Sequence, residues 1–106
     1  MKLKYKNLSS SERVMGREVI TWILDDGDIM DMVDSFHDRG LRCAVVVWLE
    51  EGDVVDAYIS DETAVTDEFE LPRVREAVAA YDPSTSVCIV VVRENRNAVT
   101  LIGDVG

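Results

Sequence analysis

The segment LRCAVVVWL at residues 41–49 decides the fold, because it is apolar on both faces of an extended chain. Three consecutive valines, Val45 to Val47, precede Trp48, so neither side of this strand suits contact with water. Strands of this kind lie inside a sheet that is covered on both faces. The segment VCIVVV at 87–92 has the same character. We therefore expect two central strands, with helices over much of both faces or with one face buried in a dimer.

Each central strand is followed by a turn and a second strand. Residues 50–53 (EEGD) form a turn, and residues 54–60 then alternate in polarity, which predicts a half-exposed strand. One side of that strand would carry Val55, Ala57 and Ile59. Residues 94–97 turn the chain again before a last strand at 98–102. These patterns predict a four-stranded sheet of two hairpins, with the valine-rich strands inside.

Three segments, 10–24, 28–39 and 72–81, have the one-sided apolar spacing of helices. Between the first two, Gly27 suits a helix C-cap and Asp28 suits the N-cap of the next helix. The third begins with proline, which is favoured at the first helical position. The element order is therefore α-α-β-β-α-β-β. We interpret it as a single α+β domain over residues 1–106, with helices packed on the sheet.

Acidic residues are concentrated in the middle of the chain. The net charge is −10, but residues 1–18 carry +3, residues 25–70 carry −13, and residues 71–106 are balanced. Such a field repels nucleic acid and membrane surfaces and attracts basic partners. The scarcity of lysine also fits a halophilic adaptation or a GC-rich genome. Salt adaptation, however, would spread acid over every surface, including that of the balanced segment.

Residue types that carry metal or nucleophile chemistry are sparse. Cys43 and Cys88 lie within apolar strands, where burial makes thiols inert, and His37 is the single histidine of the chain. The sequence DDGD at 25–28 is similar to the start of a calcium loop, but the twelfth position is Phe36 instead of glutamate. We therefore predict no catalytic set, no metal site and no cofactor, and we expect a protein that is not an enzyme.

From about residue 30 to 97 the chain resembles the JAB/MPN family, nearest its bacterial RadC-type branch. Four segments carry the resemblance: CAVVVWLE (43–50), DVVDAYIS (53–60), RVREAV (73–78) and VCIVVV (87–92). In that family the corresponding last strand leads into a His-x-His metal motif. Here RENRN at 93–97 stands in that place, so both histidines are missing, and the downstream Ser and Asp region is absent. The resemblance implies a shared fold whose zinc hydrolase activity has been lost.

These observations favour an acidic binding protein that engages a basic protein partner and does not bind nucleic acid directly. It would inhibit a nucleic-acid-binding protein or nuclease, as a phage anti-defence protein, an immunity protein or an antitoxin does, with carboxylates in place of phosphates. The predicted partner-binding residues fall on a helix stripe, a hairpin tip and an acidic loop: Asp28, Asp31, Asp34, Asp38, Glu50, Glu51, Asp53, Asp61, Glu62, Asp67, Glu68 and Glu70.

Two other functions stay open at this point. One is a diverged JAB-like or carboxylate metal-dependent hydrolase, and the other is an oligomeric structural module in which the valine-rich sheet pairs across a homodimer. The basic start at residues 1–6 lacks the apolar segment of a signal peptide, and its alternation suits an edge strand or an ordered tail. No apolar run approaches the ~18 residues of a membrane span. We therefore expect a cytoplasmic protein without membrane contact.

Overall fold

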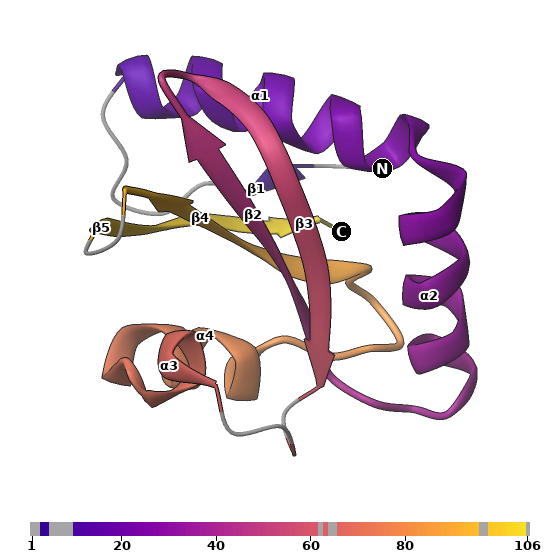
Figure 1. Cartoon of the computed structure of the whole chain (residues 1–106). Helices are drawn as coiled ribbons and strands as arrows, with labels where there is room; N and C mark the ends of the chain where they lie inside the picture. Colours follow the sequence, from indigo (N-terminus) through magenta and orange to yellow (C-terminus); the bar gives the residue numbers. More distant parts are fainter. Residues whose placement is uncertain (1–2, 5–9, 62, 64–65, 96–97, 106) are drawn as a thin grey trace.

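The two valine-rich segments form the centre of the sheet, as predicted. The computed structural model describes residues 3–4, 10–61, 63, 66–95 and 98–105. In it, β2 (Cys43–Glu50) and β4 (Cys88–Glu94) pair in parallel. Outside them, β3 (Asp53–Asp61) and β5 (Ala98–Val105) pair antiparallel with β2 and β4 respectively. The two-residue β1 (Leu3–Lys4) pairs with β5, giving the sheet order β1-β5-β4-β2-β3 (Figure 1).

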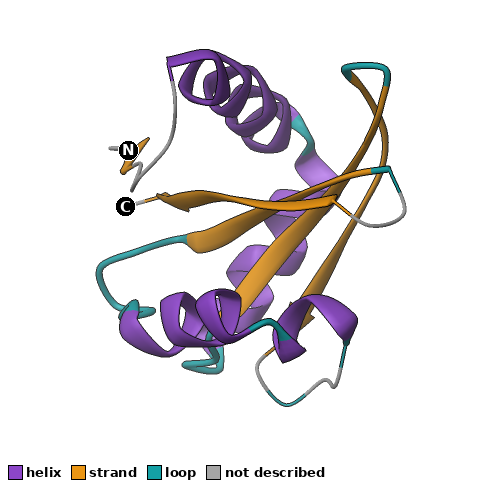
Figure 2. Ribbon diagram, turned by 90° about the vertical axis from the view of Figure 1, so that its left-hand side faces the viewer, coloured by secondary structure: helices purple, strands orange, loops and turns teal. Residues whose placement is uncertain are grey.

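Helices lie on both faces of the sheet (Figure 2). On one face are α1 (Ser10–Asp25) and α2 (Gly27–Asp38), and on the other are α3 (Asp67–Glu70) and α4 (Pro72–Ala80). The α+β class and the order of the predicted elements are confirmed. The short helix α3 is an addition, because that segment was expected to be loop.

Each face of the sheet has its own apolar core. Alternate side chains of β2 and β4 point to opposite faces, so both strands contribute to both cores. Toward α1 and α2 lie Val19, Ile20, Ile23, Ile29, Val33, Cys43, Val45, Val47, Leu49, Cys88, Val90 and Val92. Toward α3 and α4 lie Ala44, Val46, Phe69, Val74, Val78, Tyr81, Ile89 and Val91. Both thiols are free and buried, and burial raises the pKa of Cys43, which keeps it protonated.

Strand β3 departs from the predicted alternation at one residue. Trp48 pairs with Asp56 and Leu49 pairs with Val54, so Val55 is an extra residue without a pairing position, a β-bulge. The bulge shifts the alternation. Val54, together with Ala57 and Ile59, packs against the core beneath α1 and α2, whereas Val55 is 53% exposed. The prediction that Val55 shares a side with Ala57 and Ile59 is wrong for this reason.

The junction between α1 and α2 is tighter than the sequence indicated. Asp26, rather than Asp28, is the N-cap of α2, and its Oδ1 accepts hydrogen bonds from the backbone N–H groups of Asp28 and Ile29, at 3.1 Å each. Gly27 is already the first helical residue. A single residue therefore separates the two helices, and α2 turns away from α1 along the β3 side of the sheet (Figure 1).

Tyr81 joins the end of α4 to the start of β2. Its hydroxyl donates to the backbone oxygen of Cys43 at 2.9 Å and also accepts from the Cys43 N–H. The paired positions of β2 and β4 begin one residue later, at Ala44 and Ile89. The phenol therefore satisfies backbone groups for which β4 provides no partner at this end of the sheet. Burial, the largest cause, raises the pKa of Tyr81 far above its ordinary value.

Candidate partner-binding surface

The helix stripe lies on the outer face of α2. Asp28, Asp31, Asp34 and Asp38 are all exposed. At 100° per residue they fall roughly opposite the direction of Ile29 and Val33, which are buried against the sheet. From the first to the last carboxylate the helix advances about 15 Å at 1.5 Å per residue. The predicted stripe is therefore a single row of acidic side chains directed to solvent.

These four carboxylates are not neutralised by their neighbours. Arg39 follows the stripe, but its guanidinium lies 5.0 Å from the centre of the Phe36 ring, and its Nε donates to the backbone oxygen of Ser35. Within the described part of the chain, none of the four takes part in an ion pair. The row is therefore directed to solvent without a paired cation among the described residues.

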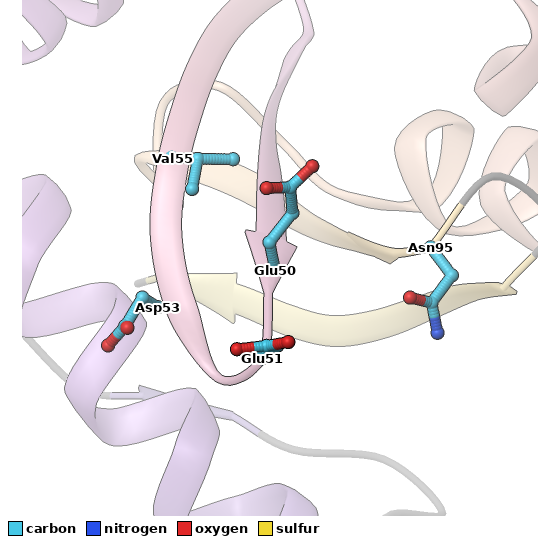
Figure 3. A pocket seen from close by; sticks show the side chains of 5 residues that line it. All are labelled: Glu50, Glu51, Asp53, Val55 and Asn95. Carbon is cyan, nitrogen blue, oxygen red and sulfur yellow. The ribbon is translucent and has the colours of Figure 1, made fainter.

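The hairpin tip forms a second acidic region. Glu51 and Gly52 both have positive φ angles, +52° and +83°, as a two-residue turn with the twist of a hairpin requires. Glu50, Glu51 and Asp53 are exposed around this turn and, with Val55 and Asn95, line an open hollow of about 490 Å³. In Figure 3 the three carboxylates point in different directions instead of converging. Among the described residues, no group of histidine, cysteine or carboxylate side chains has the arrangement of a metal site.

The predicted acidic loop is partly helical and divides its carboxylates between solvent and interior. Thr66 caps α3, and Asp67 and Glu70 are exposed on it. Asp61 is half-buried at the end of β3, where its Oδ1 accepts the backbone N–H of Thr63 at 2.9 Å. Glu62 lies outside the described residues.

Glu68 does not belong to the accessible surface, and its assignment as a partner-binding residue is wrong. Its side chain is 2% exposed, and Oε1 lies 2.6 Å from Nη1 of Arg93. Burial by itself would raise the pKa of Glu68, but hydrogen bonds from Tyr58, the backbone and Arg93, together with the Arg93 charge, outweigh it and lower that pKa. The guanidinium of Arg93 also stands 5.2 Å from the centre of the Trp48 ring. Glu68 is the buried counter-charge of Arg93.

One signal in the sequence could have indicated this pairing. Arg93 directly follows the five buried residues of β4, Cys88–Val92, so its side chain leaves the backbone next to the core. A guanidinium held there needs a carboxylate nearby, because an unpaired charge is costly to bury. Nothing in a four-residue helix, however, indicates which of its three acids turns inward. Glu68 and Phe69 do so together, and they anchor α3 against the sheet.

The three acidic regions do not form one continuous surface. The tip and the loop stand at opposite ends of the β2–β3 hairpin, because Glu50 pairs with Asp53 and Cys43 pairs with Asp61. Seven residues of strand separate these ends by about 23 Å. The outer face of α2 and the exposed side of α3 lie beyond opposite faces of the sheet (Figure 2).

Comparisons with known protein families, curated proteins and solved structures found no match. The resemblance to the JAB/MPN family therefore stays a prediction. Over the residues that the structure describes, no helix has both the length and the apolar character needed to cross a membrane.

Proposed function

We propose that this protein is a non-enzymatic acidic binding protein whose partner is basic, and that the outer face of α2 is its main contact surface. The observation that carries the proposal is the row formed by Asp28, Asp31, Asp34 and Asp38, exposed and unpaired on one face of one helix. A rigid helix holds these charges at fixed spacing, so a complementary surface gains all four interactions without ordering a loop.

The spacing of the row supports a partner that ordinarily binds a phosphate backbone. Successive carboxylates are roughly 5 Å apart along the helix axis, compared with about 3.4 Å of axis per phosphate on one strand of a duplex. Arginine and lysine side chains are long enough to absorb that difference. We therefore propose an inhibitor of a nucleic-acid-binding protein or nuclease, in which a single helix face imitates a short stretch of backbone. This is a smaller mimic than the three-part surface expected from the sequence.

Affinity capture followed by competition tests the proposal. The immobilised protein is exposed to lysate at low salt, bound proteins are released by raising the salt, and a recovered basic protein is purified. Duplex DNA should then displace it, because both ligands occupy the same basic surface. If the recovered protein binds the inhibitor and the duplex at the same time, mimicry is excluded.

Matched variants assign the surface. The double change Asp31→Asn with Asp34→Asn should weaken binding about tenfold through loss of two charge pairs. The double change Glu18→Gln with Glu76→Gln alters the net charge equally at exposed positions of α1 and α4. It should weaken binding much less. Equal effects of the two doubles would mean that the overall field attracts the partner and that α2 is not the contact surface.

A further inference from the structure

The outer edge of β3 is open along the middle of the strand. β3 is the last strand in the sheet order and forms the right-hand border of the sheet in Figure 2. Its side toward β2 is fully paired from Asp53 to Asp61, apart from the bulge. Among the described residues, no strand pairs with its other side. An edge of this length is a template for another extended chain unless it is blocked.

Two contacts show which backbone groups face the open edge. The backbone N and O of Cys43 both contact Tyr81, so this residue is directed away from β3. Alternate residues of an antiparallel pair exchange hydrogen bonds, so the odd-numbered positions from Cys43 to Val47 do not bond to β3. Their partners in this register, Ala57 and Ile59, must then direct their own N–H and C=O groups outward.

The position of Asp56 agrees with this assignment and explains how the edge is protected. Its Oδ1 accepts the backbone N–H of Ala57 at 2.8 Å, which places that N–H on the outside. In the described structure the outward N–H of Ile59 has no comparable acceptor. Asp56 therefore covers one donor of the edge with a charged group, and the next donor along remains open.

The chemistry of this edge selects its occupant. Asp53 and Asp56 are exposed on the strand, and Tyr58, which shares a face with Asp56, is 39% exposed. A second copy of the chain would bring the same aspartates against these, and like charges across a strand pair are destabilising. A strand with lysine or arginine at alternate positions would instead pair with both carboxylates and place a cation near the Tyr58 ring.

We propose that the open edge of β3 accepts an extended basic segment of the protein partner as an added strand. The partner's carbonyl replaces Asp56 at the Ala57 N–H, and the released carboxylate pairs with a basic side chain of the partner. A strand without basic side chains would displace Asp56 from the Ala57 N–H and give its carboxylate no cation to pair with. The inference rests on the proposed function for one point, that the partner is basic. It adds a second contact surface, bound through the backbone.

A synthetic peptide tests the proposal even while the partner is unidentified. The probe is an eight-residue peptide with blocked ends in which lysine alternates with threonine. Its control is the same peptide with every backbone amide N-methylated, which keeps all charges and side-chain groups and removes only the backbone N–H donors. Strand addition predicts that N-methylation weakens binding at least about tenfold, because several backbone hydrogen bonds are lost.

Hydrogen exchange gives a readout inside the protein. The Ile59 amide should exchange rapidly in the free protein and become protected when the unmethylated peptide is added. The Tyr58 amide, which bonds to β2, is the internal control and should be protected throughout. The Ala57→Pro variant removes the outward N–H of Ala57, and proline is tolerated at a strand edge. It should bind the unmethylated peptide more weakly, because one backbone hydrogen bond to the peptide is lost.

The outcomes separate this inference from the proposed function. Equal binding of the two peptides, with Ile59 still exchanging rapidly, would overturn strand addition and leave the acidic-surface proposal standing. Failure of both peptides to bind at low salt would count against both proposals. Dimer formation that protects Ile59 without peptide would also overturn the inference, because the occupant would then be a second copy. If Ala57→Pro does not fold, the comparison of the two peptides on the unaltered protein still decides the question.

Discussion

Glu68 and Asp31 are carboxylates from the same acidic half of the chain, but their surroundings give them different roles. Asp31 stands on the solvent face of α2, in the row that we propose as the partner contact. Glu68 points inward from α3 and pairs with Arg93. Tyr58 is hydrogen-bonded to Glu68, and Arg93 lies over the ring of Trp48. Acidity alone therefore does not identify a binding residue, and the position relative to the sheet decides.

The variant Glu68→Gln tests the buried pair. Breaking a fully buried pair costs roughly 3–5 kcal/mol. The side chain of Arg93 is 23% exposed, and glutamine keeps an acceptor, so we expect a loss of about 2 kcal/mol at neutral pH. Urea unfolding followed by circular dichroism measures it. The control Glu70→Gln, exposed on the same short helix, should stay within about 0.5 kcal/mol of the parent.

The same pair predicts an acid-sensitive component of stability. Folding lowers the pKa of Glu68, so its contribution is complete above the ordinary glutamate pKa of about 4.3 and is lost as the pH falls through the lowered value. The stability difference between the parent and Glu68→Gln should therefore shrink below about pH 4. A difference that stays constant from pH 7 to pH 3 would show that the charge of Glu68 does not stabilise the fold.

At the scale of elements, the sequence predicted what long patterns can indicate. The helices of 10–24 and 28–39 and the two valine-rich strands follow from apolar spacing sustained over many residues. The bulge was not predictable, because Val54 and Val55 are the same residue type and no pattern distinguishes which one faces the core. Helix α3 is one turn long, too short to show a period. The inward turn of Glu68 was missed for the same reason.

The cap of α2 is a prediction at this scale. Replacing Asp26 by alanine removes the acceptor for two N–H groups in the first turn and should destabilise the protein by about 1 kcal/mol. Asp25→Ala is the matched control. That residue is the exposed last residue of α1, where a negative charge opposes the helix dipole, so its removal should be neutral or slightly stabilising. Thermal unfolding of the two variants measures both changes, and Asp26→Ala should have the lower melting temperature.

The link between α4 and β2 gives a second element-scale prediction. Tyr81→Phe keeps the ring in its core and removes the hydroxyl that bonds the backbone N and O of Cys43. We expect a loss of about 2 kcal/mol, because two buried backbone groups lose their partner. Native-state hydrogen exchange should show faster exchange at Cys43, while amides in the middle of β2 change less. An unchanged rate at Cys43 would mean that other groups satisfy it.

For the whole molecule, the sheet arrangement explains why the clustered charge of the sequence becomes dispersed in space. Residues 25–70, whose net charge is −13, run through α2, then up β2 and down β3 to α3. They therefore reach both ends of the hairpin and both faces of the sheet. Sequence proximity gave no information on this, because a hairpin with helices on either side sends neighbouring segments in opposite directions. What remains concentrated is the row on α2 and the acidic open edge of β3.

Self-repulsion of the net negative charge gives a test that separates two explanations of the acidity, a partner-binding surface and halophilic adaptation. A net charge of −10 on a chain of 106 residues destabilises the compact state until salt screens it. The melting temperature should rise as sodium chloride increases from about 0.01 M to about 0.5 M, and then level off as the Debye length falls toward a few ångströms.

The double variant Asp31→Lys with Asp34→Lys should show a smaller rise, since it carries four fewer net negative charges. Glu18→Lys with Glu76→Lys, matched in charge, should show the same reduction if the repulsion is global. Stability that keeps climbing into molar salt in all three proteins would favour halophilic adaptation, and the acidic row on α2 would then need no partner to explain it.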